Sequence, residues 1–135
     1  MKKVLTTGLI AGAILLALSF GMIYLTILVF PGVAEQYYNP VFRSGGERNM
    51  LFYLHPFILG LALAWFWERF KGQFSGSFLF RGLELGLVYA VVAILPAMWI
   101  TFSAIDVSLT MVVTWLLYGF VQASVAGVIF AKLNR

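Results

Sequence analysis

Residues 4–30 of the chain read VLTTGLIAGAILLALSFGMIYLTILVF, and these 27 consecutive positions contain no charged side chain. A helix needs about 20 predominantly apolar residues to cross the roughly 30 Å of hydrocarbon in a bilayer. Three further apolar stretches follow, at residues 50–70, 78–102 and 107–131. Because no water is present in the hydrocarbon to satisfy backbone polar groups, stretches this long are expected to cross as helices. The sequence therefore predicts an all-α membrane protein with four transmembrane helices.

Composition supports this class of protein and excludes several others. Hydrophobic residues make up 62% of the chain and charged residues only 10%, which is far from the balance of a soluble domain. Cysteine is absent, so thiolate nucleophiles, disulfide exchange and thiolate metal sites are excluded. The single histidine, His55, cannot form a bis-histidine haem site or a histidine-rich metal centre. We therefore expect one integral membrane domain over residues 1–135, with no metal and no cofactor.

The distribution of basic residues predicts the orientation of the helices. If the N-terminus is cytoplasmic, seven basic residues lie on the cytoplasmic side, and only Arg43 and Arg48 lie on the outer side. Cytoplasmic loops carry an excess of Lys and Arg, so this bias favours both termini in the cytoplasm. Orientation accounts for the basic residues, and we therefore predict no nucleic-acid binding. The seven cytoplasmic residues are Lys2, Lys3, Arg69, Lys71, Arg81, Lys132 and Arg135.

The connections between the apolar stretches predict how the helices pack. Residues 32–49 form the longest polar segment and are expected to be an outer loop, whereas residues 103–106 form a tight outer turn. Helices joined by short connections pack as antiparallel neighbours, so we predict an up-down-up-down four-helix bundle. Pro96 lies inside the third stretch and cannot donate a backbone hydrogen bond, which predicts a kink. Trp65 and Trp67 are expected to anchor the second helix at the inner headgroup level.

Small residues recur every four positions in all four stretches, and the longest row is in the last one. Such rows allow helix backbones to approach closely, which drives helix association in lipid. Two interpretations remain open. The row packs against another helix of the same chain, which we favour, or it forms the seam of a homodimer. The homodimer interpretation places Gly119, Ala123 and Gly127 at the interface.

A row of polar residues in the last stretch is the first candidate site. Its members are four residues apart, so they climb one slanted ridge of a helix from the outer turn into the membrane. Glu84 of the third stretch lies at the depth toward which the row points, and a carboxylate inside a span is a functional hypothesis by default. These groups would line a path for a proton, a cation or a small polar solute. The row consists of Asp106, Thr110, Thr114, Tyr118 and Gln122.

A structural role is the alternative for each of these groups. Thr hydroxyls in membrane helices commonly donate to a carbonyl one turn back, and Gln122 would bond to a neighbouring helix. Arg81 precedes Glu84 by three residues on the same helix face, so these two side chains would form a local ion pair.

The second candidate site is an outer pocket formed by polar and aromatic residues near the outer loop. Glu35, Tyr38, Arg48 and His55 would offer both signs of charge and aromatic walls, and pockets between helices are common ligand sites. The alternative is a solvated loop whose tyrosines belong to the outer aromatic belt. In that case, His55 would be satisfied by Asp106 or by a backbone carbonyl.

Several short sequence features, taken in their order along the chain, are similar to those of a known kind of membrane protein. These features are Lys3-Val4-Leu5 leading into Gly8 and Gly12, Tyr38 and Arg48 in the outer loop, Gly60, Arg81-Gly82-Leu83-Glu84-Leu85-Gly86, and a glycine-rich last helix. In this order the chain resembles small four-helix integral membrane proteins of bacteria, of the domain-of-unknown-function type. The resemblance implies a multi-pass protein of the bacterial inner membrane and transfers no activity.

The sequence favours a non-enzymatic membrane protein, either an accessory subunit of a membrane-protein partner or a binder of lipids or small ligands within the bundle. The alternative is a small channel or transporter that uses the polar path between the third and fourth stretches. An enzyme is the least favoured class, because no nucleophile–base pair or metal constellation can be assembled from the sequence.

Overall fold

The computed structural model describes residues 1–42 and 49–134, and the predicted site residue Arg48 lies outside them. Within the described residues the chain is helical and contains no strand. Its elements are α1 (Lys2–Val29), α2 (Pro31–Gln36), α3 (Asn49–Phe70), α4 (Phe78–Tyr89), the π-helical turn η1 (Ala90–Ile94), α5 (Leu95–Ala104) and α6 (Leu109–Leu133).

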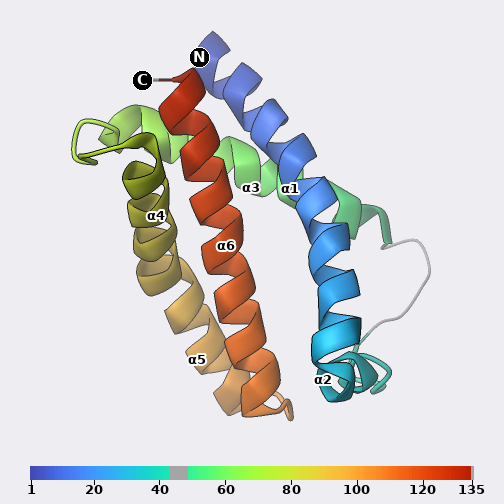
Figure 1. Cartoon of the computed structure of the whole chain (residues 1–135). Coiled ribbons are helices and arrows are strands. Elements are labelled where there is room, and N and C mark those ends of the chain that lie inside the picture. The colour runs from blue at the N-terminus through green and yellow to red at the C-terminus, as the bar shows by residue number, and fades with distance from the viewer. Residues whose placement is uncertain (43–48, 135) are drawn as a thin grey trace.

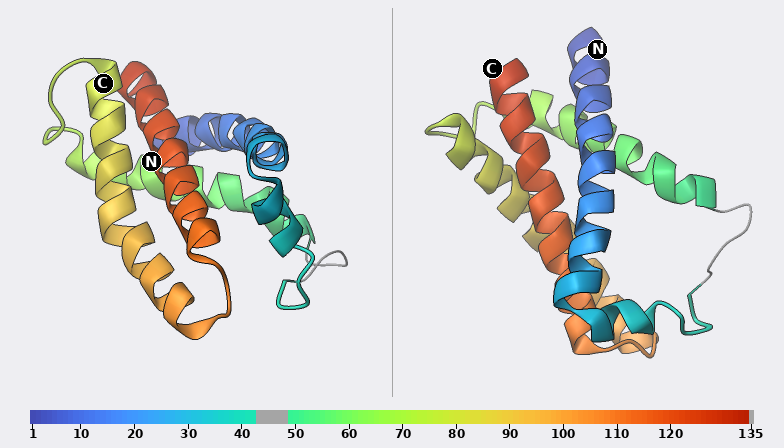
Figure 2. Two further views of the ribbon diagram at one scale, coloured as in Figure 1. Left: turned by 60° about the horizontal axis from the view of Figure 1, so that its bottom comes forward. Right: turned by 45° about the vertical axis from the view of Figure 1, so that its right-hand side comes forward.

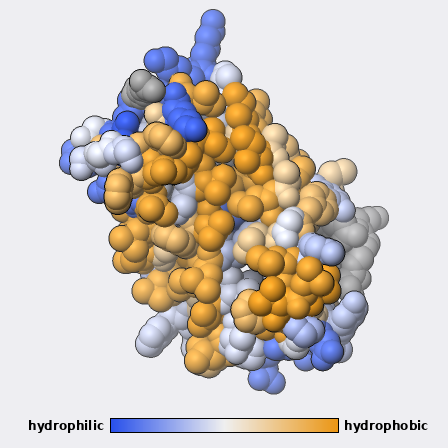
Figure 3. All heavy atoms as spheres, viewed as in Figure 1, coloured by the Kyte–Doolittle hydropathy of each residue, from blue (hydrophilic) through white to orange (hydrophobic). Residues whose placement is uncertain are grey.

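Four helices are long and apolar enough to cross a membrane, namely α1, α3, the continuous helix from α4 to α5, and α6. On the face shown in Figure 3, hydrophobic residues form a broad region between hydrophilic residues gathered at the two ends. The predictions of an all-α chain and of four membrane-spanning helices are confirmed at this level. These helices indicate a multi-pass membrane protein.

The helices pack as two hairpins, α1 with α3 and α4 with α6, and α6 also contacts α1 and α3. Figure 1 shows α3 crossing obliquely behind α6 and α1, with both termini at one end of the molecule, and Figure 2 gives two further views. Although α3 and α4 follow each other in the chain, they do not pack along each other. The prediction that all consecutive helices are neighbours is therefore wrong for this pair.

Glycines determine how closely the two helices of each hairpin approach. A Cβ atom added at Gly60 of α3 would lie 2.6 Å from the carbonyl oxygen of Gly8 and 2.8 Å from the backbone nitrogen of Gly12. A Cβ atom at Gly127 of α6 would lie 2.8 Å from the Cα atom of Gly82 in α4. At both places only a hydrogen atom fits, because backbone faces backbone.

The long row of small residues on α6 is covered within the chain. Gly119 faces Ile94 of η1, Gly127 faces Gly82, and Ala123 is 0% exposed. The row therefore packs against the α4–α5 helix, as the first of the two interpretations predicted. Homodimerisation itself stays a prediction, and its seam would have to use another face.

A kink was predicted at Pro96, and the structure has the π-helical turn η1, which ends two residues before it. Leu95 donates its backbone N–H to the carbonyl oxygen of Ala90, five residues earlier. Proline cannot donate, and the wider turn takes up the resulting break in the α-helical ladder. The helix therefore continues through Pro96 into α5.

The most tightly packed half of the molecule is the half near the termini. Its buried apolar side chains come from the N-terminal half of α1, from α3 and the turn that follows it, from α4 and from the C-terminal half of α6. After Ser19, by contrast, most of α1 is exposed. The other half of the molecule is consequently open enough to hold a pocket. The core consists of Ala11, Leu15, Leu59, Leu63, Ala64, Trp67, Phe74, Leu85, Ala123, Ala126, Phe130 and Ala131.

Candidate functional site

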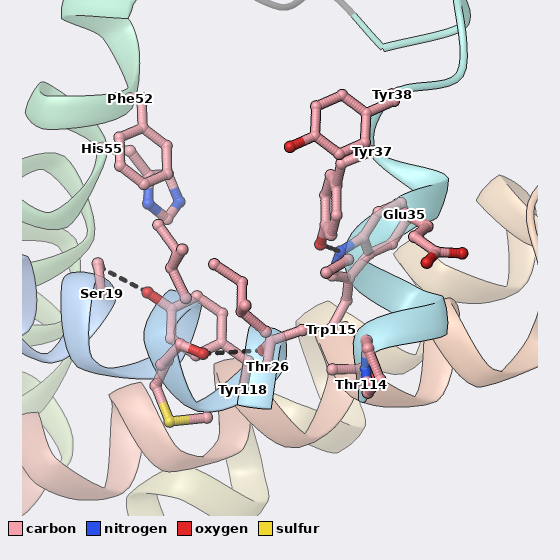
Figure 4. Close-up of a pocket in the computed structure, with 15 residues that line it drawn as sticks. Ser19, Thr26, Glu35, Tyr37, Tyr38, Phe52, His55, Thr114, Trp115 and Tyr118 are labelled. Atoms are coloured by element: carbon pink, nitrogen blue, oxygen red, sulfur yellow. Dashed lines mark hydrogen bonds between the residues drawn. The ribbon is translucent and has the colours of Figure 1, made fainter. Parts of the chain in front are cut away.

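A pocket of about 880 Å³ lies in the open half of the molecule. Its walls come from the C-terminal half of α1, from α2 and the residues just after it, from the start of α3 and from α6. Figure 4 shows side chains from these four elements facing the pocket. Ligand pockets commonly measure roughly 300–1,000 Å³ and are mostly apolar, so this one has the size for a small molecule. Its apolar lining includes Met22, Ile23, Ile27, Pro31, Ala34 and Phe52.

A directed chain of hydrogen bonds forms the floor of the pocket. Gln122 donates from Nε2 to the Tyr118 hydroxyl at 2.9 Å, and Tyr118 donates to Ser19 Oγ at 2.6 Å. Ser19 in turn donates to the carbonyl oxygen of Leu15 at 2.8 Å. Ser19 and Gln122 are buried, with 3% and 2% of their surfaces exposed. The hydroxyl groups of Tyr118 and Ser19 therefore both donate to acceptors within the protein.

An aromatic cluster links α6 to the segment around α2 at the side of the pocket. Trp115 donates from Nε1 to the Tyr37 hydroxyl at 2.5 Å. Phe42 packs against both rings, with ring centroids 5.4 Å from Tyr37 and 6.1 Å from Trp115. These contacts connect the residues that follow α2 to α6 and give the pocket a wall of aromatic rings.

Polar groups at the rim of the pocket have no partner among the described residues. Glu35, Tyr38 and His55 line the pocket, yet their side chains make no hydrogen bond or ion pair with another described residue. In Figure 4, Glu35 and Tyr38 come from the α2 side and His55 from the α3 side. The structural alternative for His55 predicted a hydrogen bond to Asp106 or to a backbone carbonyl. Among the described residues, His55 makes neither bond.

The structure brings parts of the two predicted sites into one pocket. Thr114 and Tyr118 belong to the predicted polar row, and Glu35, Tyr38 and His55 belong to the predicted outer pocket. The Thr114 hydroxyl donates to the carbonyl oxygen of Thr110 at 2.7 Å, which is the structural role considered for such threonines.

The remaining members of the polar row do not line this pocket. Asp106 and Thr110 are exposed and lie outside it. Glu84 lines a second hollow of about 560 Å³, together with Leu87 and Phe120. Gln122, in contrast, bonds through Tyr118 toward α1. Glu84 and Gln122 thus lie on different sides of α6, and the described residues do not join them in one polar path.

The ion pair considered for Glu84 is also not formed. Arg81 instead donates from its guanidinium to the carbonyl oxygen of Lys71 at 3.0 Å. The same guanidinium lies over the indole ring of Trp67, 4.8 Å from the ring centroid. Arg81 therefore points into the end of the bundle near the termini, and Glu84 has no ion-pair partner among the described residues.

A polar cluster that the sequence did not predict joins the ends of α3 and α6. Trp67 donates from Nε1 to the backbone carbonyl oxygen of Asn134 at 2.9 Å. The Asn134 amide donates to Glu68 at 2.6 Å, and Lys71 Nζ lies 3.3 Å from the same carboxylate. Trp67 is 0% exposed and stacks on Phe74 at 5.3 Å between ring centroids. Trp67 is thus a buried structural clamp and not an interfacial anchor, whereas Trp65, the other residue of the predicted anchor, is 52% exposed.

In the part of the chain that the structure describes, no group of three or more His, Cys, Asp or Glu residues is placed to hold a metal ion. No protein-family model, curated protein or solved structure matches the chain. The fold and the site describe the class of protein. The described part of the chain is all-helical, has four helices that could span a membrane, and has a largely apolar pocket between helices.

Proposed function

We propose that the chain is a non-enzymatic membrane protein that binds a lipid or another amphiphilic molecule in the pocket formed by α1, α2, α3 and α6. The observation that supports this proposal is the distribution of polarity in the pocket. The middle is apolar, the hydroxyls of the floor bond each other, and the polar groups of the rim are unpartnered among the described residues. An amphiphile matches this distribution when its apolar part enters first and its polar part stays at the rim.

The two other roles proposed for the chain are an accessory subunit and a channel or transporter. An accessory subunit is compatible with the same pocket, because the bound amphiphile or the surrounding helices would contact a membrane-protein partner. A channel or transporter is less well supported, because Glu84 and Gln122 lie on different sides of α6. We therefore place ligand binding first.

Filling the pocket is expected to weaken binding about tenfold. Met22 lines the pocket, and Met22→Trp would place a bulky ring in the space that the apolar part of the ligand occupies. We expect labelling of pocket residues by a photoreactive single-chain lipid analogue to fall about tenfold, since overpacking typically costs 1–3 kcal/mol. The measurement is peptide mapping by mass spectrometry in lipid nanodiscs, with labelling expressed relative to the lipid-facing residue Leu95, which is 46% exposed.

The matched control is Leu25→Trp on the same helix. Leu25 is 48% exposed and does not line the pocket, so this variant should label like the original protein. The proposed function is contradicted if pocket residues are labelled no more strongly than Leu95, or if Met22→Trp leaves their labelling unchanged.

The proposed orientation places both termini in the cytoplasm and the pocket rim toward the outside of a bacterial inner membrane. The end of the bundle near the termini carries most of the basic residues, including Lys2, Lys3 and Lys132, as cytoplasmic ends of membrane proteins do. Reporter tags at each terminus should be accessible only from the cytoplasm, and a tag in the turn at residues 105–108 only from outside. A tagged turn on the same side as the termini would overturn the orientation.

A further inference from the structure

We infer that the amphiphile recognised by this pocket carries a positively charged head group, an inference that rests on the proposed function. Among the described residues that line the pocket, Glu35 is the one Asp, Glu, Lys or Arg, and His55 is the one histidine. Glu35 forms no ion pair and no hydrogen bond with another described residue. The carboxylate is therefore available to a bound cation.

The aromatic residues that line the pocket support the same sign of charge. Tyr37, Tyr38, Phe52 and Trp115 all line the pocket. The faces of aromatic rings carry partial negative charge and attract ammonium groups, most strongly in tryptophan, and quaternary ammonium ligands are commonly held by several rings. Tyr37 and Glu35 both come from the segment around α2 and lie on the same side of the pocket, with the Glu35 carboxylate at its outer edge (Figure 4).

An anionic head group would be repelled at the rim. No Lys or Arg occurs among the described residues that line the pocket, so a sulfonate or phosphate would face Glu35 without a described cation to compensate it. A like charge placed close to a carboxylate is repelled. Charge at the rim thus discriminates between amphiphiles that share the same apolar part.

The floor determines which end of the ligand enters. Tyr118 and Ser19 use their hydroxyl hydrogens in the chain of bonds that leads to Leu15, so a polar head at the floor would find no free hydroxyl donor. An apolar tail needs none. The ligand class is therefore a cationic amphiphile whose tail lies against Met22 and Ile23 and whose head lies at the rim with Glu35.

The test uses three photoreactive probes with one alkyl chain and different heads, namely trimethylammonium, hydroxyl and sulfonate. The full chain is held in nanodiscs of uncharged lipid, and pocket labelling is divided by labelling of the lipid-facing residues Leu95 and Ile100, which corrects for partition into the bilayer. We expect the ammonium probe to label the pocket about fivefold more than the sulfonate probe. Glu35→Gln should reduce this preference and leave only the part that the aromatic rings contribute.

Glu84→Gln is the matched control, because the Glu84 carboxylate is also exposed but lies outside the pocket. It should leave the ammonium preference unchanged. Equal pocket enrichment of all three probes would preserve the proposed function and overturn the inference about charge. A sulfonate preference, or an ammonium preference that Glu35→Gln does not reduce, would overturn it as well. Enrichment of no probe would overturn the proposed function itself.

Discussion

Gly60→Ala is expected to lower the free energy of unfolding by about 3 kcal/mol, the upper end of what overpacking a core usually costs. The added Cβ atom would lie 2.6 Å from the carbonyl oxygen of Gly8 and 2.8 Å from the backbone nitrogen of Gly12. Both neighbours belong to the backbone of α1, so no side-chain rotation can relieve the clash. The helices α1 and α3 would have to separate, and their packing along the hairpin would weaken.

The measurement for Gly60→Ala is reversible unfolding in mixed micelles, followed by the loss of helical circular dichroism. Gly21→Ala is the matched control, because a Cβ atom at Gly21 of α1 would have no neighbour within 4 Å. We expect Gly21→Ala to be neutral or slightly stabilising, since alanine favours the helix over glycine. Equal stability of the two variants would show that the close approach of α1 and α3 is not required.

Trp67→Ala is the second change with a large expected effect, a loss of about 4 kcal/mol of unfolding free energy, as is typical of buried aromatic residues truncated to alanine. The side chain is 0% exposed and stacks on Phe74. Its Nε1 donates to the carbonyl oxygen of Asn134, and the Arg81 guanidinium lies over its ring. The substitution would thus leave a cavity and release the end of α6 from the end of α3.

The control for Trp67→Ala is Trp99→Ala, since Trp99 is 77% exposed on α5. The same unfolding experiment should show little change for this variant, and limited proteolysis should cut the C-terminus faster only in Trp67→Ala. Trp67→Phe keeps most of the ring packing and should lose only about 1 kcal/mol with the hydrogen bond to Asn134. If Trp67→Ala unfolds like Trp99→Ala, the clamp between α3 and α6 does not contribute to stability.

Stability and the proposed binding site lie in different halves of the molecule. Gly60 and Trp67 belong to the half near the termini, where the buried core is continuous. Met22 and Glu35 belong to the open half, where most of α1 is exposed. Changes at the pocket should therefore affect binding with little effect on unfolding, and changes in the core should do the opposite.

The candidate site was predictable only in part. The sequence identified Thr114, Tyr118, Glu35, Tyr38 and His55, all of which line the pocket, but it assigned them to two separate sites. The polar row was expected to follow one ridge of the last helix. Because each step of four residues turns the helix by about 400°, the direction of the side chains shifts by roughly 120° over the twelve residues from the second to the last member of the row.

That rotation explains which members of the row reach the pocket. Thr110 is exposed near the start of α6, whereas Gln122 is buried and bonds to Tyr118. The clamp of Trp67 and Asn134 was not predictable either, since the two residues lie 67 positions apart and no spacing rule connects them.

The sequence by itself determined the helical class and the four spans, whose observed bounds lie within two residues of the predicted ones. Length and hydropathy are local properties, and the absence of water in lipid leaves the backbone few alternatives to a helix. Glycine spacing likewise predicted close packing of helices. Which helix covers each glycine row was decided only by the tertiary structure, because hydrophobicity does not distinguish a helix face that contacts lipid from one that contacts another helix. The tertiary packing also leaves most of α1 exposed beyond Ser19. The pocket lies between this part of α1 and α6.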